Sequence, residues 1–306
     1  MILDQSVGWE GIYPVEPAFI PVVQLNYLTG RAVPVAAGPL KHLESPDDAA
    51  LDHPLHDQAG IELILRVLRE SSEPVYVSVV GSARPLAAAY NRDPDMVRKK
   101  VRAILLNAGS TGSFFEWNVE IDPMAYICLF KSGMTIYWYP CATENGPFDS
   151  DNHNTFWRTS HRTIFKDLPL PMRAWFTHSY SGNMRGDIIR ALHEQGNWSP
   201  WDNIFSAPAR NLWSTASLIT AANRALVKTG EGWRFVSKSE ATTDAARQRL
   251  GLKPVNVTID EGAITSWTPS EGGSNVMLYG RDHGPEHTEA MAEALNALLC
   301  SIHAEL

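Results

Sequence analysis

The sequence predicts an α/β fold: a doubly wound, mostly parallel sheet with helices on both faces, followed by a C-terminal β-hairpin and a helix. Between residues 17 and 140, short apolar runs alternate with helical stretches of about ten residues, as in βαβ units. Several of these runs are apolar and β-branched at nearly every position, which is typical of strands covered on both faces. The length of 306 residues, with 44% hydrophobic and 20% charged residues, suits one globular domain.

Turn and capping signals define the elements of this first half. A helix over 19–28 ends at Gly30, the usual residue just past a helix end, and the proline-interrupted polar stretch 41–57 is a loop. Asp93 and Asp122, each followed by proline, begin two further helices. The expected helices are 19–28, 59–70, 85–91, a short one after Asp93, and 123–131. The expected strands are 32–37, 75–80, 101–106 and 134–139, with 75–80 covered on both faces.

The second half has a different pattern. Residues 141–160 are polar and loop-like, and 161–230 are rich in Trp, Arg and helix formers, which predicts a helical region. Two strands, 255–260 and 263–268, flank a turn at Gly262 and predict an antiparallel hairpin, and 287–303 predict a closing amphipathic helix. Because no internal repeat or low-complexity linker occurs, we expect a single domain over residues 1–306, with 17–140 as its recognisable α/β core.

Charge and cysteine content narrow the classes of partner. Twenty-six Lys and Arg against 34 Asp and Glu give a net charge of −8, which argues against a general nucleic-acid binder. No apolar run approaches the roughly 20 residues that span a bilayer, and the first residues lack signal-peptide features. Three cysteines without a CxxC pair predict neither a zinc ribbon nor a disulfide framework. We therefore expect a cytoplasmic protein with a small-molecule partner, no membrane partner, and room for a homo-oligomer.

The stretch 105–126 carries the most chemical information. The predicted strand 101–106 is followed by the candidate binding residue Asn107 and a Gly/Ser loop, and then by Glu116, Trp117 and Asn118 in succession. Ligands of parallel sheets bind at the carboxyl ends of the strands. Glu and Asn can together bind vicinal hydroxyls, and an aromatic ring between them can contact a sugar or a base. The alternative is a structural loop in which Glu and Asn cap neighbouring backbone groups.

A resemblance to a known family adds to this interpretation. Residues 73–139 resemble the middle of the inosine–uridine preferring nucleoside hydrolases in both the order and the spacing of their motifs, and 19–38 resemble the family's upstream helix and strand more weakly. The matching pieces are Val79-Val-Gly-Ser-Ala-Arg-Pro-Leu86, Asp93-Pro-Asp95, Ile104-Leu-Leu-Asn-Ala-Gly109, Glu116-Trp-Asn118 and Asp122-Pro-Met-Ala125.

The resemblance implies hydrolysis of a ribosyl N-glycosidic bond, assisted by a bound calcium ion. It implies that Glu116 and Asn118 hold ribose hydroxyls and that Trp117 lines the sugar. A backbone carbonyl near Arg84 occupies the place from which the family takes one calcium ligand. In the segment 210–217, Asn211 can offer a neutral oxygen and Trp213 can stack on a base.

Two departures from the family bear on activity. The family begins with a strand rich in aspartates, whereas the acids before Phe19 are the unpaired Asp4, Glu10 and Glu16. The family's later His-Asp pair has no counterpart in 210–217. Calcium needs several carboxylate oxygens, so its ligands are largely missing and no catalytic base can be assigned. We expect a nucleoside hydrolase; the alternative is a truncated or degenerate member that binds a nucleoside, sugar or glycan without cleaving it.

Other motifs are weaker. Asp149-Ser-Asp-Asn-His153 alternates oxygens like the start of a calcium loop, but it lacks the Gly and the closing Glu of an EF-hand, so we favour a solvated loop. His53 or His56 could reach the pocket from the 41–57 loop. Gly109-Ser-Thr-Gly112 lacks the Lys of a phosphate-binding loop, and no Gly-x-Ser-x-Gly elbow occurs. The Trp-rich stretch 198–213 is either a pocket wall or an interface.

Overall fold

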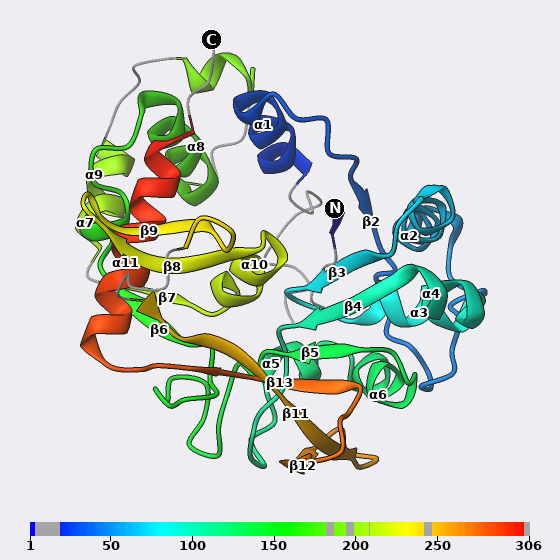
Figure 1. Ribbon diagram of the computed structural model, residues 1–306. Helices are drawn as coiled ribbons and strands as arrows, with labels where there is room; N and C mark the ends of the chain where they lie inside the picture. Colours follow the sequence, from blue (N-terminus) through cyan, green and yellow to red (C-terminus); the bar gives the residue numbers. More distant parts are fainter. Residues whose placement is uncertain (4–18, 182–186, 194–198, 208, 242–246, 303–306) are drawn as a thin grey trace.

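A six-stranded mixed sheet forms the centre of the computed structural model, which describes every residue except 4–18, 182–186, 194–198, 208, 242–246 and 303–306 (Figure 1). Its strand order is β12-β11-β13-β5-β4-β3. The strands β3, β4, β5 and β13 run parallel, and β11 pairs antiparallel with both β13 and β12. The expected mostly parallel sheet with a C-terminal hairpin and helix is confirmed. The central strands are β3 (Val75–Val79), β4 (Val101–Leu106), β5 (Ile136–Trp138), β11 (Leu250–Ile259), β12 (Thr265–Pro269) and β13 (Val276–Arg281).

The remaining elements surround this sheet. Smaller sheets pair β1 with β2 in parallel, and pair β6 with β7 and β8 with β9 and β10 antiparallel. Their bounds are β1 (Ile2–Leu3), β2 (Ala36–Ala37), β6 (Trp157–Thr159), β7 (Arg210–Leu212), β8 (Arg224–Thr229), β9 (Gly232–Ser237) and β10 (Arg247–Gln248). The helices are α1 (Phe19–Thr29), α2 (Ala59–Glu70), α3 (Arg84–Arg92), α4 (Pro94–Lys100), α5 (Trp117–Glu120), α6 (Pro123–Lys131), α7 (His161–Ile164), α8 (Leu170–Ser181), α9 (Ser199–Ser206), α10 (Thr215–Ala221) and α11 (Pro285–Cys300).

Capping residues place the helices of the first half as predicted. The α1 helix is followed by Gly30 with φ +61°, a conformation that glycine adopts without strain. Asp93 accepts a hydrogen bond from Met96 N (3.3 Å) at the start of α4, and Asp122 accepts one from Ala125 N (3.0 Å) at the start of α6. The α2 helix has the predicted bounds, and its buried apolar residues pack against α3 and α4.

One face of β3, β4 and β5 is covered by helices. Figure 1 shows α2, α3, α4 and α6 on this side of the strands. The main hydrophobic core lies between them and includes the buried side chains of Leu65, Leu86, Ile104, Ile136 and Trp138. Burial of these apolar side chains is the main source of stability in this half of the molecule.

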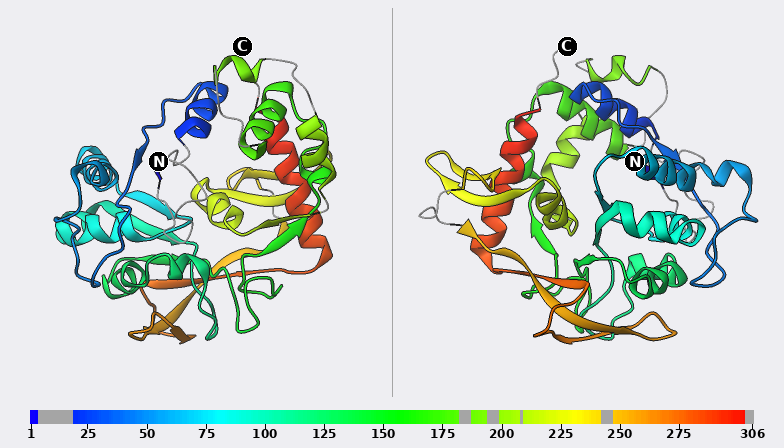
Figure 2. Two further views of the ribbon diagram at one scale, coloured as in Figure 1. Left: turned by 180° about the vertical axis from the view of Figure 1, so that it is seen from behind. Right: turned by 45° about the vertical axis from the view of Figure 1, so that its right-hand side comes forward.

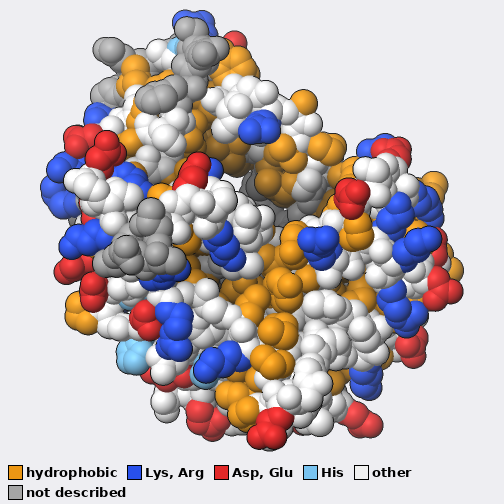
Figure 3. All heavy atoms as spheres, viewed as in Figure 1, with side chains coloured by type: hydrophobic (Ala, Val, Ile, Leu, Met, Phe, Trp, Pro, Cys, Tyr) orange, Lys and Arg blue, Asp and Glu red, His pale blue; other side chains and the backbone are white. Residues whose placement is uncertain are grey.

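The opposite face of β3 is open, so the expectation that this strand is covered on both faces is wrong. The Tyr76 side chain is 44% exposed and Val80, just past the strand, is 52% exposed. The cause lies in the packing, since α10 contacts β3 but leaves these two side chains exposed. Figure 3 shows hydrophobic side chains along the hollow on this side of the molecule.

The second half holds more β-structure than the sequence predicts. Figure 2 shows α11 packed beside β8 and β9, with α7, α8 and α9 next to it. A second core, with the buried Trp157, Trp201 and Trp233, joins these elements. The expected helical region 161–230 is therefore only partly helical, because it also holds β7 and β8. The expected 32–37 strand is reduced to β2, which pairs with the two residues of β1.

Two further findings concern the class of protein. None of the helices in the described residues is long and apolar enough to cross a membrane. Cys128, Cys141 and Cys300 are free thiols.

Candidate functional site

The loops that follow β3, β4 and β5 meet at one edge of the sheet. Val79, Leu106 and Trp138 are in register, so the three parallel strands end side by side. The Asn107 N–H donates to Val79 O (2.9 Å), and Cys141 N donates to Gly109 O (2.9 Å). These bonds place the Gly/Ser loop of the sequence between its two neighbours, at the edge where ligands of parallel sheets bind.

Asn107 is fully buried at the end of β4. Its Nδ2 donates to Val79 O (2.9 Å) and to Leu105 O (3.3 Å), so the amide nitrogen is hydrogen-bonded to backbone carbonyls near the ends of β3 and β4. Its Oδ1 is buried and has no hydrogen-bond partner among the described residues. An unsatisfied buried acceptor is unusual in a folded protein and is a position where a donor from a ligand or water can bind.

Glu116 is also buried, with 5% of its surface exposed. Its Oε2 accepts a hydrogen bond from Gly109 N (2.9 Å). Burial raises the pKa of this carboxyl from 4.5 to about 7, while the backbone amides of Gly109, Asn118 and Val119 act in the opposite direction. The side chain therefore changes its charge near neutral pH, as groups at functional sites often do.

Asn118 completes a group of three polar side chains. Its Nδ2 donates to Asn107 O (2.9 Å), which leaves its own Oδ1 to accept. We call Asn107, Glu116 and Asn118 the Glu116 cluster. The structure brings these three predicted residues together, although two of the amide nitrogens and one carboxyl oxygen are already bound to backbone. These backbone bonds agree with the structural-loop interpretation, while the remaining amide side-chain oxygens agree with the ligand-binding interpretation.

Trp117, which lies between Glu116 and Asn118 in the chain, differs from them in exposure. Its side chain is 49% exposed, and those of Phe114 and Phe115 are 38% and 41% exposed. Phe148, on the loop after β5, is 62% exposed. These four residues form what we call the aromatic rim. The two loops are joined by Glu144, whose carboxylate accepts from Ser113 N (2.7 Å) and Ser113 Oγ (2.8 Å).

The predicted residues Asn211 and Trp213 lie outside the Glu116 cluster. Asn211 is exposed in β7, opposite Arg158 of β6. Trp213 Nε1 donates to Pro147 O (3.2 Å), and its ring packs on Phe148 and Phe156 at centroid distances of 5.9 and 5.4 Å. Trp213 therefore packs against Phe148 of the aromatic rim. Among the described residues, no hydrogen bond or ring contact joins it to Glu116 or Asn118.

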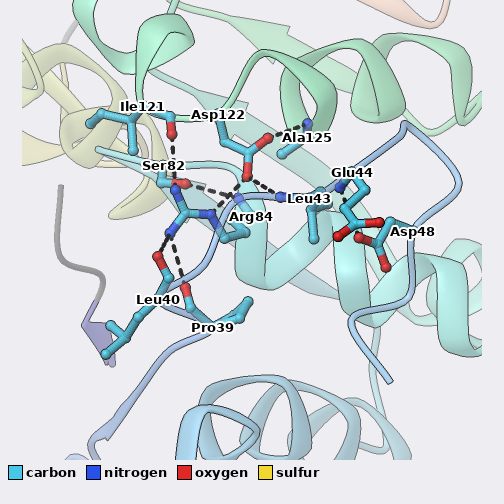
Figure 4. Close-up of polar contacts among 10 residues, drawn as sticks. All are labelled: Pro39, Leu40, Leu43, Glu44, Asp48, Ser82, Arg84, Ile121, Asp122 and Ala125. Carbon is cyan, nitrogen blue, oxygen red and sulfur yellow. Dashed lines mark hydrogen bonds and ion pairs between the residues drawn. The ribbon is translucent and has the colours of Figure 1, made fainter. Parts of the chain in front are cut away.

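A buried ion pair between Arg84 and Asp122 was missed by the sequence analysis (Figure 4). The Arg84 guanidinium is fully buried and donates to Asp122 Oδ2 (2.7 Å) and to the carbonyls of Leu40 (2.8 Å) and Ile121 (2.9 Å). The second Asp122 oxygen caps α6, and Oδ2 also accepts from Leu43 N (3.0 Å). The pair joins the starts of α3 and α6 to the 39–43 loop. Arg84-Pro85 and Asp122-Pro123, both at predicted helix starts, were the available signal.

The oxygen atoms around Arg84 do not form a suitable set of calcium ligands. Calcium takes six to eight oxygen ligands, several of them carboxylates. Here the guanidinium already supplies a positive charge, and both oxygens of the Asp122 carboxylate are used. In the part of the chain that the structure describes, no group of three or more His, Cys, Asp or Glu side chains is arranged to hold a metal. The described residues alone therefore do not build the expected calcium site.

The weaker motifs of the sequence are the 149–153 loop and the histidines His53 and His56. Asp149 accepts from Thr143 Oγ1 (2.5 Å), and Asp151 accepts from the backbone N–H of His153 (2.7 Å), so these oxygens stabilise their own loop. His56 is exposed. His53 is buried, and neither of its ring nitrogens has a hydrogen-bond partner among the described residues.

Comparison with known proteins identifies relatives of this chain. No family model matches it. Over 138 residues it is 28% identical to the pyrimidine-specific ribonucleoside hydrolase RihA of Citrobacter koseri. The matched region covers 38% of this chain and 44% of that protein. Over 132 residues it is 29% identical to RihA of Escherichia coli O7:K1, which covers 37% of this chain and 42% of that protein. Over this part of its length, the chain is similar to ribonucleoside hydrolases.

The extent of this similarity is limited. The chain matches less than half the length of these curated relatives. Among solved structures, it is similar to the purine-preferring ribonucleoside hydrolase from Gardnerella vaginalis, with 13% identity, a TM-score of 0.48, and coverage of 91% of this chain and 85% of that one. It is also similar to the plant nucleoside hydrolase PpNRh1, with 17% identity, a TM-score of 0.48, and coverage of 92% and 85%.

Proposed function

We propose that this chain, acting as one domain, hydrolyses the N-glycosidic bond of a nucleoside or a related N-riboside, with the ribose held by the Glu116 cluster. The observation that carries the proposal is the meeting of one carboxyl and two amide side chains at the carboxyl edge of the sheet. The curated relatives, which are ribonucleoside hydrolases, give the reaction class.

The chemistry of the cluster suits a sugar with free hydroxyls. Ribose hydroxyls need acceptors, and the cluster offers Asn107 Oδ1, which has no partner in the described residues, and Asn118 Oδ1, whose amide nitrogen is already bound. Glycosidic cleavage passes through an oxocarbenium-like state, so hydroxyl contacts that strengthen in this state accelerate the reaction. A carboxyl with a pKa of about 7 can accept such a bond when ionised and can hold a proton when neutral.

The aromatic rim gives a place for the base. Trp117 and Phe115 lie in the chain next to Glu116, and Phe148 is brought close by the Glu144 contacts to Ser113. Exposed rings at the edge of a polar cluster can stack on a purine or pyrimidine, which supports a nucleoside over a free sugar. We include Trp213 in this role because it packs behind Phe148.

The resemblance also implies calcium, which would position a water molecule beneath the ribose. Because the donors of the described residues do not fit calcium, the role proposed for the Glu116 cluster is independent of a metal. It is confined to holding and orienting the riboside.

Turnover tests the proposed reaction. Release of free base and ribose is measured by chromatography from a panel of purine and pyrimidine nucleosides, with calcium and with a chelator. We expect release from at least one nucleoside. Saturable binding of a nucleoside without release in either condition would contradict hydrolysis and favour the non-cleaving alternative.

Location and assembly are also part of the proposal. We propose a cytoplasmic protein, because its three cysteines are free thiols, as is usual in a reducing compartment. A homo-oligomer is proposed on the resemblance alone, and light scattering of the purified protein measures it directly.

A further inference from the structure

We propose that a second pocket, between β11, β12 and the loop after β5, binds a flat aromatic ring that carries one anionic group. The cavity has a volume of about 460 Å³, within the range of small-molecule sites. Its lining includes none of the Glu116 cluster residues, and the inference does not depend on the proposed nucleoside chemistry.

Two facing glycines form the floor of this pocket. Gly251 of β11 and Gly280 of β13 are in register, and both line the cavity. A Cβ at Gly251 would meet only Gly280 O, at 4.0 Å, so the backbone does not require glycine there. Glycine inside a strand weakens it and often marks close approach of a ligand. Their missing side chains leave a flat backbone surface, which we call the glycine floor.

Aromatic rings form the walls above the glycine floor. The Trp267 ring is fixed by its Nε1, which donates to Thr111 O (3.2 Å). His153 stands edge-on to it at a centroid distance of 5.3 Å, and its Nδ1 lies 2.8 Å from Tyr279 O. In the neutral ring Nδ1 must then carry the hydrogen, which leaves Nε2 as an acceptor. A planar ring fits this space better than a branched group, because both walls and floor are flat.

The charges around the pocket favour an anion. Lys253 lines the cavity, is exposed, and has no ion pair within the described residues. Arg249 also lines it and lies 3.2 Å from Asp282. Arg281, next to Gly280, is buried and donates to the carbonyls of Asp151 and Phe156. Lys253 is therefore the group placed to bind a carboxylate, sulfonate or phosphate.

Binding of 2-naphthoate, followed by titration calorimetry, tests the ligand class. The controls are 2-naphthamide, which lacks the charge, and cyclohexanecarboxylate, which lacks the flat ring. We expect 2-naphthoate to bind about tenfold more tightly than either control. No measurable binding of 2-naphthoate, or equal binding of all three compounds, would overturn the proposal.

Variants test the location. Gly251→Val fills the open space above the glycine floor, and we expect it to fold and to lower the affinity for 2-naphthoate by at least about tenfold. Circular dichroism and thermal unfolding check the fold. Lys253→Met should lower the affinity about fivefold, whereas the matched Lys228→Met on β8 should not. A folded Gly251→Val that binds like the wild type would contradict the assignment, as would loss of binding in Asn118→Ala.

Discussion

At the scale of single residues, the buried carboxyl of Glu116 makes stability depend on pH. Its pKa rises from 4.5 to about 7 on folding because burial disfavours the charged form. The folded state thus keeps a proton that the unfolded chain loses, and the free energy of unfolding falls as pH rises from about 4.5 to 7. In Glu116→Gln this loss is absent. From pH 5 to pH 8, the free energy of unfolding of the variant should therefore rise by about 2 kcal/mol relative to that of the wild type.

Urea unfolding of both proteins at the two pH values measures this difference. Glu144→Gln is the matched control, because Glu144 is an exposed glutamate whose pKa is lowered by its hydrogen bonds to Ser113. A constant difference between Glu116→Gln and the wild type at pH 5 and pH 8 would mean that Glu116 is not buried as described.

Gly109 is a second residue with a specific role. Its φ is +82°, and a Cβ at this position would overlap the buried hydroxyl of Tyr126. Gly109→Ala should therefore lower the free energy of unfolding by about 2–4 kcal/mol, from backbone strain plus the clash. Gly133→Ala, with φ +72° and open space around it, should cost only about 1 kcal/mol. Equal losses in the two variants would contradict the close packing at Gly109.

At the scale of elements, the Arg84–Asp122 pair holds two helix starts and a loop together. Asp122→Asn leaves a buried guanidinium without its carboxylate, so we expect a loss of about 3–5 kcal/mol in chemical unfolding. Glu44→Gln removes one partner of an exposed pair with Lys41 and should change stability far less than Asp122→Asn does. A small effect of Asp122→Asn would show that the pair does not anchor α3 and α6.

The elements also show what the sequence can predict. The α2 helix and the β4 strand follow from periodicity and glycine or proline signals, because these are local, whereas only the second half of β11 was expected, as 255–260. The openness of β3 could not be predicted, since the run Val75–Val79 is the same whether or not another element covers Tyr76. The β8–β9 hairpin was missed although Gly230 and Glu231 make a two-residue turn between its strands.

The candidate site was predictable in part for the same reason. Glu116 and Asn118 are close in sequence to the end of β4, so their proximity to Asn107 follows from the strand and loop. Trp213 and Asn211 come from a distant segment, and their positions depend on how β6 and β7 pack. The Arg84–Asp122 pair joins residues 38 apart, and the prolines that follow both residues mark helix starts without indicating that the two charges pair.

At the scale of the whole molecule, a ligand that binds only the folded state stabilises it. A nucleoside at about one hundred times its Kd should add about 2.7 kcal/mol and raise the Tm by about 4 °C for a chain of this length. Thermal unfolding with and without the nucleoside measures the shift, with the free base as control. An unchanged Tm across the nucleoside panel would contradict binding.

The central claim is that the Glu116 cluster holds the ribose hydroxyls of a nucleoside. Titration calorimetry of one bound nucleoside and its 2′,3′-dideoxy analogue tests it most directly, in the wild type, in Asn118→Ala and in Asn256→Ala, an exposed asparagine on β11. We predict that the wild type and Asn256→Ala bind the ribonucleoside about tenfold or more tightly than the analogue, and that Asn118→Ala loses this preference. Equal affinity of the wild type for both ligands would contradict the claim.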